Sequence, residues 1–455
     1  MRTDTFELYI HIPFCVRKCG YCDFLSFPAG KDVQLRYLEA LKTEIRDTGE
    51  RLRRTDLRSD RSRSVKERRG EWNPERITSI FIGGGTPSVL TGDQIAAVMD
   101  AVRESFLVQS DAEITIEANP GTLDPEKLRR FRAAGINRIS IGCQSMHDRE
   151  LVRMGRIHSH AEFLQSYQWA RQAGFDNINV DLIAALPGQT LADWRDTLHT
   201  AAALGPEHIS AYNLILEEGT PFYEQRDTLD LPDEDTERAM YEETASILAA
   251  YGYRQYELSN YAKPGMTCRH NQGYWTGIPY LGMGLGAASY WPADAGGWLP
   301  DGSVRSAGYS VRPSDESAQP TEDTLRTAED TVRPAEDSVL LKTGTEPQMV
   351  RYNNTSELQQ YLAAARTKES RIDSSTIERL SQPDCMAEFM ILGLRMTDGI
   401  SKAEFRRRFD REPDQVYGEI IRKYQNAGLL QCEEDRIFLT GRGRSLANVV
   451  MMEFL

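Results

Sequence analysis

The stretch YIHIPFCVRKCGYCDFLSF, Tyr9–Phe27, decides the fold. It begins as a short apolar strand and then places Cys15, Cys19 and Cys22 at the spacing C-x3-C-x2-C. In a chain of 455 residues with seven cysteines, such crowding favours metal binding over disulfides. Three thiolates can hold three irons of a 4Fe–4S cube, and the fourth iron is then open to a small molecule.

Structural zinc is the alternative metal for these cysteines. A structural zinc site closes with four ligands, and no further Cys or His follows the motif at a normal spacing. His11 precedes Cys15 by four residues, but on a strand its side chain should point to a separate position. The ligand count therefore favours a cluster.

The composition excludes several classes of protein. Hydrophobic residues make up 40% of the chain, enough for a packed core, and the length predicts two or three units. The net charge of −14 disfavours nucleic-acid partners, because an acidic protein repels phosphate backbones. The N-terminus lacks the pattern of a secretory signal, and no apolar run reaches the roughly 18 residues of a membrane helix. We expect a cytoplasmic protein with no transmembrane segment.

Short β-rich runs alternate with stretches of helical periodicity through the first half of the chain. The expected strands are Glu7–Ile12, Ser79–Gly85, Glu113–Pro120, Asn137–Cys143, Asn177–Pro187 and His208–Leu216. The expected helices are Gln34–Thr48, Gln94–Phe106, Pro125–Ala134, Ala161–Ala173, Leu191–Leu204 and Asp235–Ala250. This alternation predicts a parallel α/β sheet, open or curved into a barrel, with functional loops at the carboxyl ends of the strands.

Two segments are interpreted as insertions. Arg51–Glu71 is rich in Arg and Ser, which predicts a solvated loop. The segment 293–349 contains an imperfect repeat, seen in TEDTLR, AEDTVRP and AEDSVLL, and we expect a flexible low-complexity excursion. It separates a first unit, 1–292, from a C-terminal helical, winged-helix-like unit, 350–455. In that last unit we expect helices at Ala387–Arg395, Lys402–Phe409 and Gln415–Ala427 and a β-hairpin at Leu429–Thr440.

The motif YIHIPFCxxxCxYC resembles that of the coproporphyrinogen-oxidase-like branch of the radical S-adenosylmethionine (SAM) superfamily. The resemblance covers nearly the whole chain apart from the two insertions. It implies a three-quarter (β/α)6 barrel with a C-terminal domain, a 4Fe–4S cluster on the three cysteines, and an electron donor to the cluster. It also implies SAM, bound through its amino and carboxylate groups to the open iron, where the reduced cluster can break the sulfonium bond to the ribosyl 5′-carbon.

The same resemblance implies residues that contact SAM. Tyr9, Gly84 and Glu117 match contacts to the cluster-bound SAM. Gly85 and Thr86 match contacts to a second SAM in the oxidase, and the second-SAM or substrate-side positions are matched by Gln144, Arg156 and Asp181.

The residues alone leave other interpretations open for these positions. Tyr9 could be a half-buried strand aromatic, and Glu117 could form an ion pair at a strand end. A run of glycines is usually a turn, although glycines also let a ligand approach the backbone and free amides can bind a carboxylate. Asp181, in an apolar strand, needs a polar partner, and Arg156 could pair with a carboxylate.

Two subfamilies differ around the motif. The oxygen-independent coproporphyrinogen III oxidases carry a long segment ahead of it and a further cysteine just after it. Here the motif strand begins at about residue 7, and Phe24 stands where the extra cysteine would be. The ending Cys22-Asp23-Phe24 is instead similar to that of the HemW-like haem chaperones.

A second segment, HNQGYW (His270–Trp275), matches the HNxxYW motif of HemW-like proteins, which implies haem binding with His270 as the candidate ligand. Imidazole can ligate haem iron, and Tyr274 and Trp275 can pack on the macrocycle. Cys268 is another possible ligand. From the residues alone the segment could instead pin a loop against the barrel, because one histidine is not a haem signature.

We therefore expect a haem chaperone that carries a SAM-ligated cluster and delivers haem to apo-haemoproteins. The alternative is an enzyme, either an oxygen-independent coproporphyrinogen III oxidase or another radical-SAM porphyrin-modifying enzyme. A plain structural iron–sulfur protein explains neither the GGGTP loop (83–87) nor the open iron. The remaining cysteines, Cys143, Cys385 and Cys432, are interpreted as small apolar residues.

Overall fold

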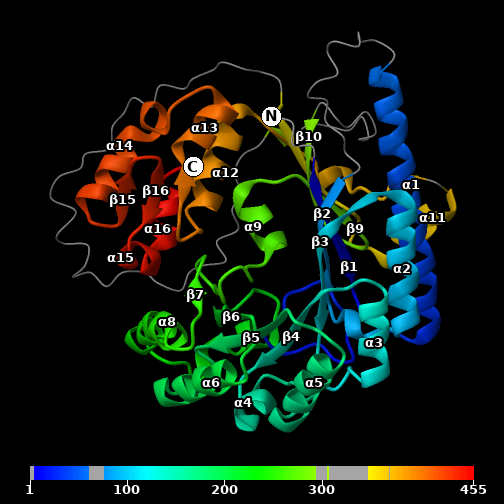
Figure 1. Cartoon of the computed structure of the whole chain (residues 1–455), viewed down its shortest axis with the longest axis horizontal. Helices are drawn as coiled ribbons and strands as arrows, with labels where there is room; N and C mark the ends of the chain where they lie inside the picture. Colours follow the sequence, from blue (N-terminus) through cyan, green and yellow to red (C-terminus); the bar gives the residue numbers. More distant parts are fainter. Residues whose placement is uncertain (1–4, 61–75, 294–304, 307–346, 368) are drawn as a thin grey trace.

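Six parallel strands form the centre of the molecule. The structure, a computed structural model, describes residues 5–60, 76–293, 305–306, 347–367 and 369–455 (Figure 1). The strands are neighbours in chain order: β1 (Phe6–Ile12), β2 (Arg76–Gly84), β3 (Leu107–Ala118), β4 (Arg138–Gln144), β5 (Ile178–Ala184) and β6 (His208–Asn213). Each adjacent pair is parallel. All six predicted strands are confirmed.

The predicted helices are also confirmed, and they lie in an arc around the outside of this sheet (Figure 1). They are α1 (Lys31–Asp60), α2 (Gly92–Ser105), α3 (Pro125–Ala133), α5 (His160–Gln172), α6 (Leu191–Ala203) and α8 (Glu234–Ala249). Capping boxes at Thr91, Ser159 and Thr190 begin three of them. Their apolar faces pack on the sheet and build the main core.

The sheet does not close into a full barrel. Beyond β6 it ends on two short antiparallel strands, β8 (Asn260–Ala262) and β7 (Arg254–Gln255). On the other side, β1 pairs in parallel with β9 (Tyr280–Met283), which is followed by β10 (Ala288–Pro292). The result is a curved, open (β/α)6 sheet, as the sequence predicts.

Helix α1 is longer than expected. Residues 51–60 continue the helix, whereas the sequence predicts that a solvated loop begins at Arg51. The helix extends because Leu52 is buried and Arg53 Nη1 donates to Ser105 O at 2.8 Å, which ties this turn to the end of α2. The rest of the predicted loop, 61–71, lies outside the described residues.

The insertion at 293–349 connects two paired strands. Strand β12 (Met349–Asn353) runs antiparallel to β10, with Pro292 opposite Met349, and Ala293 N donates to Gln348 O at 3.0 Å. Residues 294–304 and 307–346 lie outside the described part of the chain. The two ends of the insertion are therefore held together by neighbouring strands, with β13 (Glu378–Leu380) and β11 (Arg305–Ser306) beyond them in the sheet.

The C-terminal unit has its own core. It contains α12 (Gln382–Gly393), α13 (Lys402–Phe409), α14 (Pro413–Asn426) and a small sheet of β14 (Ile400–Ser401), β15 (Leu430–Glu433) and β16 (Arg436–Leu439). Val350, Tyr352 and Tyr361, which follow the expected boundary, pack in the main core, and the second core joins Leu258 to residues from Leu380 onward. None of the helices in the described residues is long and apolar enough to cross a membrane.

Candidate iron–sulfur and SAM site

The three cysteines lie on the loop between β1 and α1, at the carboxyl end of the parallel strands. The loop is held by backbone bonds from Cys15 N to Phe27 O at 3.1 Å and from Phe27 N to Pro13 O at 2.9 Å. All three cysteines are free thiols of intermediate exposure. Cys15 Sγ lies 3.4 Å from Thr86 Oγ1, which joins the loop to the end of β2.

The spread of the sulfurs fits a cluster better than a single ion. A tetrahedral zinc with Zn–S bonds of about 2.3 Å needs sulfurs roughly 3.8 Å apart. The sulfurs of Cys15, Cys19 and Cys22 do not all lie within 4.8 Å of one another. A 4Fe–4S cube presents its irons at separate corners, so its thiolates stand further apart.

His11 is not free to act as a fourth ligand. Its Nε2 lies 2.9 Å from Leu25 O, and since a carbonyl only accepts, Nε2 carries the proton. The other nitrogen, Nδ1, then accepts from Tyr9 OH at 2.9 Å. Burial lowers the pKa of His11, which keeps the ring neutral. The His11 side chain is therefore held by Tyr9 and Leu25, in a position separate from the cysteines, as the sequence predicts.

The thiol of Cys22 keeps its proton near neutral pH when no iron is bound. Burial raises the pKa of the Cys22 thiol, and the neighbouring sulfurs of Cys19 and Cys15 raise it further. Because iron binds the thiolate, loading a cluster would release protons.

The glycine run packs against protein. At Gly84, where φ is +111°, a Cβ atom would lie 2.5 Å from the His11 ring, and at Gly85 it would lie 2.8 Å from Phe14 O. The amides are also engaged: Gly85 N donates to Ile12 O at 2.8 Å and Thr86 N to Phe14 O at 2.7 Å. The run needs glycine because it crosses the end of β1, which the sequence does not reveal.

The carboxylate bound by this run is that of Glu117. Gly84 N donates to Glu117 Oε2 at 3.1 Å. Burial raises the pKa of Glu117 to about 8, and the nearby Asp181 raises it further while the Gly84 amide opposes the shift. Near neutral pH Glu117 therefore keeps its proton in the ligand-free site.

Asp181 lies deeper, in a network of polar strand residues. It accepts from Ser140 Oγ at 2.8 Å and from Asn179 Nδ2 at 2.7 Å. Burial raises its pKa, and these donors oppose the shift. The sequence predicts that Asp181 needs polar partners. Strand β4 supplies one of them, Ser140, and the aspartate's own strand supplies the other, Asn179.

Arg156 joins the cysteine loop to the strand ends. Its Nη1 lies 3.6 Å from Cys19 Sγ, and its Nη2 donates to Gly142 O at 2.7 Å and to Asn119 Oδ1 at 3.0 Å. Gln144 ends β4 with a left-handed φ of 71°, and its amide nitrogen lies beside Gly142. The structure thus brings Arg156 and Gln144 together at the edge that carries the cysteines.

The chain has close relatives among known proteins. The radical SAM superfamily model matches residues 9–201, and the HemN C-terminal domain model matches residues 380–446. The chain is 33% identical over 450 residues to "Heme chaperone HemW" of Bacillus subtilis, covering 98% of both proteins. The chain belongs to the HemW family, within the radical SAM superfamily.

Other members and one solved structure agree with this assignment. The HemW family protein of Lactococcus lactis is 32% identical, covering 98% of this chain and 96% of the relative. That of Escherichia coli is 40% identical over 282 residues, which cover 62% of this chain and 69% of the relative. The solved coproporphyrinogen III oxidase (HemN) of Escherichia coli has the same fold, with a TM-score of 0.72 at 22% identity, covering 100% of this chain and 91% of that one.

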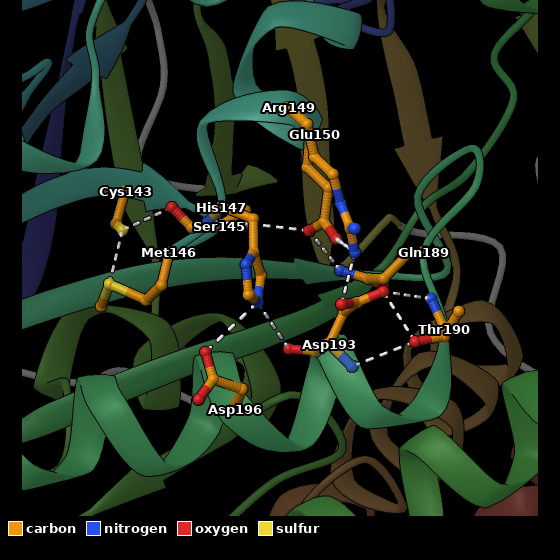
Figure 2. A network of polar contacts seen from close by, with 10 residues as sticks. All are labelled: Cys143, Ser145, Met146, His147, Arg149, Glu150, Gln189, Thr190, Asp193 and Asp196. Carbon is orange, nitrogen blue, oxygen red and sulfur yellow. Dashed lines mark hydrogen bonds and ion pairs between the residues drawn. The ribbon is translucent and has the colours of Figure 1, made fainter.

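Figure 2 shows a second group of possible metal ligands beside this edge, formed by His147, Glu150 and Asp193. Their ligand atoms lie within 4.8 Å of one another. However, the guanidinium of Arg149 already contacts Asp193 Oδ1 and lies 3.8 Å from Glu150 Oε1. Glu150 also accepts from Gln189 Nε2 at 2.9 Å. The guanidinium of Arg149 therefore already supplies the positive charge that these carboxylates need. The network fixes the loop after Gln144 and links it to the start of α6.

His270, the candidate haem ligand, lies away from the cysteine loop, on a helix that packs against strand β2. It belongs to α9 (Arg269–Thr276), and its ring packs face to face on Phe81 with centroids 5.3 Å apart. Nδ1 lies 2.8 Å from Ser79 Oγ, and Nε2 lies 3.0 Å from Tyr274 OH. Burial lowers its pKa to about 3. An iron could reach this imidazole only after one of these hydrogen bonds breaks.

Cys268, the other possible haem ligand, is also buried and engaged. Its Sγ lies 3.3 Å from Glu113 Oε1, and the same carboxylate accepts from the backbone of Arg269 and His270. Glu113 thus caps the N-terminus of α9. The HNQGYW segment is therefore held against the barrel, as in the alternative interpretation of these residues.

Sequence reasoning missed two residues of the site. Asn119 orients Arg156 from the end of β3, and Arg17 Nη2 donates to Gly155 O at 2.6 Å from the cysteine loop. Asn119 follows Glu117 in the run EANP, at the end of a predicted strand. This position at a strand end could have indicated that Asn119 belongs to the site.

Proposed function

We propose that this protein is a haem chaperone that carries a 4Fe–4S cluster on Cys15, Cys19 and Cys22. The cluster would take SAM at its open iron, and the protein, which we expect in the cytoplasm, would bind haem and deliver it to apo-haemoproteins. The proposal is supported by the similarity, over nearly the full length, to proteins named as haem chaperones.

One observation carries the cluster part of the proposal: three partly exposed cysteines lie on one loop, and their sulfurs do not all lie within 4.8 Å of one another. His11 is engaged, and Phe24, at the position of the oxidase cysteine, is 65% exposed. When bound, the cluster supplies one electron to the sulfonium of SAM, and a partner protein would have to reduce it.

The chain's own residues support a SAM site beside this loop. Tyr9 is held by His11 and stacks on Phe81, with ring centroids 6.4 Å apart. Glu117 has a raised pKa, and a cationic ligand nearby would lower it, so SAM binding should release a proton. Because Gly84, Gly85 and Thr86 already use their amides, we expect the glycine carbonyls and the Thr86 side chain to contact SAM. The roles of Gln144, Arg156 and Asp181 toward a second SAM or a substrate remain predictions.

The test separates the chaperone from the enzyme. Protein with an anaerobically reconstituted cluster should bind haem stoichiometrically and transfer it to an apo-haemoprotein, followed by the Soret absorbance. With SAM, a reductant and coproporphyrinogen III it should form no protoporphyrinogen, and formation of that product would assign the oxidase function instead. Cys15→Ser, Cys19→Ser and Cys22→Ser should lose cluster iron, whereas Cys432→Ser, in the C-terminal unit, should keep it.

A further inference from the structure

Two adjoining cavities lie where α9 and strands β9 and β10 meet the C-terminal unit. Their volumes are about 260 and about 70 Å³. Both are lined by Trp275, Gly277, Tyr290, Glu388 and Leu392, so they form one cleft. The cleft approaches the size of small-molecule sites, which begin at about 300 Å³. None of these residues belongs to the cysteine site.

The walls of the cleft suit a flat, largely apolar ligand. Aromatic rings come from both sides, with Tyr274 and Trp275 on α9, Tyr290 on β10 and Phe389 on α12. Guanidinium groups lie over one face of the Trp275, Phe389 and Tyr290 rings, so a macrocycle would pack on the opposite faces. The indole N–H of Trp275 is buried and has no hydrogen-bond acceptor among the described residues. This donor is therefore available to a bound molecule.

Two guanidinium groups line the cleft, and one of them, that of Arg408, can favour a carboxylate. Arg408 Nε donates to Glu404 Oε1 at 2.6 Å, and its Nη1 points toward Gly277, 3.0 Å from the position of a Cβ atom there. The Nη groups of Arg408 carry no hydrogen bond among the described residues, whereas Arg351 Nη2 donates to Glu388 Oε1 at 2.6 Å. A guanidinium fork binds carboxylates in a bidentate manner, which favours an anionic ligand at Arg408.

The cleft also contains ligands suited to haem iron. Met349 and Cys385 both line the smaller cavity, and thioether and thiolate sulfurs are ligands of haem iron in proteins. Aromatic rings, the Nη groups of Arg408 and sulfur donors together match an iron porphyrin with two propionates.

The position of His270 fits this assignment. Its Nε2 is hydrogen-bonded to Tyr274 OH, and Tyr274 lines the larger cavity. His270 is therefore a positioning residue that holds one wall of the cleft, and it need not touch the iron.

We infer that haem binds in this cleft between α9 and α12, with a propionate on Arg408. The inference rests on the proposed function, because it names where the cargo of the chaperone is held. The bound haem would contact both units of the chain, so a change in their packing would open or close its site.

The test uses the full-length protein and two variants that act on the cleft in different ways. Arg408→Gln removes the propionate partner, and Leu392→Trp fills the space shared by both cavities. We expect each to raise the Kd for haem at least tenfold. Arg407→Gln is the matched control, because Arg407 also pairs with Glu404 but is 58% exposed and does not line the cleft. It should change the Kd less than twofold.

A modified ligand separates contact from folding. The dimethyl ester of the iron porphyrin lacks propionate charges, so it should bind the wild type more weakly, and Arg408→Gln should weaken it no further. Thermal unfolding and cluster iron should match the wild type in each variant used. If the wild type takes up no haem, the proposed function fails. If it binds haem and both cleft variants bind as tightly as Arg407→Gln, the site assigned here is overturned.

Discussion

The guanidinium of Arg156 lies 3.6 Å from Cys19 Sγ and holds this sulfur against the ends of β3 and β4. Hydrogen bonds and positive charge at cluster sulfurs stabilise the reduced state. We therefore expect Arg156→Gln to lower the reduction potential of the reconstituted cluster by roughly 60 mV, a tenfold change in the one-electron equilibrium. Anaerobic redox titration monitored by electron paramagnetic resonance measures this shift.

The control for that experiment is Arg153→Gln. Arg153 donates to Pro187 O at 2.7 Å and has no hydrogen bond to a sulfur in the part of the chain that the structure describes. An equal shift in both variants would show that the Arg156 contact with Cys19 does not set the potential.

His270→Ala should destabilise the protein in the absence of haem. The change removes a buried ring and its hydrogen bonds with Ser79 and Tyr274, so we expect a loss of about 2–4 kcal/mol in the free energy of unfolding. Urea unfolding measures it. His199→Ala, at an exposed histidine that bonds only Tyr251 OH, should cost less than about 1 kcal/mol. A loss below that figure for His270→Ala would contradict the positioning role.

Gly84→Ala should cost more stability than Gly174→Ala. Both glycines have a positive φ, so each alanine costs about 1–2 kcal/mol in backbone strain. At Gly174 the added Cβ meets nothing within 4 Å, whereas at Gly84 it collides with the buried His11 ring. The difference between the two variants in urea unfolding measures the collision together with the greater backbone strain at Gly84, where φ is +111°. Equal values would mean that the end of β1 yields without cost.

The stability of the metal-free protein should fall as the pH rises from about 5 to 8. The pKa of Glu117 rises to about 8 in the folded state from an ordinary value of 4.5, so the folded state binds the extra proton in this window. Each pH unit there costs up to about 1.4 kcal/mol, until the pH passes the folded pKa. Glu117→Gln removes this contribution and should flatten the profile.

The exposed Glu126→Gln is the matched control for that profile, and it should keep the slope of the wild type. Urea unfolding at pH 5.5, 6.5 and 7.5 compares the pH dependence of stability in the Glu117→Gln and Glu126→Gln variants. An unchanged slope in Glu117→Gln would show that another group carries the dependence.

The alternation of strands and helices and the cysteine spacing were enough to predict the barrel and the thiol site, because both are local patterns. Helix α1 was underestimated, since its last turns depend on Leu52 and on a bond from Arg53 to the end of α2. The role of the glycine run could not be predicted either, because it depends on how His11 and Phe14 cross it.

The position of His270 was out of reach for a similar reason. Its partner Ser79 stands 191 positions earlier, and no periodicity reports which strand a distant helix will meet. The same holds for the cleft: Arg408 belongs to the run Arg406–Arg408, which in the sequence resembles a solvated helix face.

The place of β1 in the sheet has a consequence for synthesis. This strand lies between β2 and β9, so one of its two partners begins only at Tyr280. At about 5–20 residues per second, a ribosome would need roughly 15–50 s to reach that partner after finishing β1. Until then the cysteine loop grows from a strand with one open edge, so the nascent chain must shield this edge from aggregation before any cofactor can be loaded.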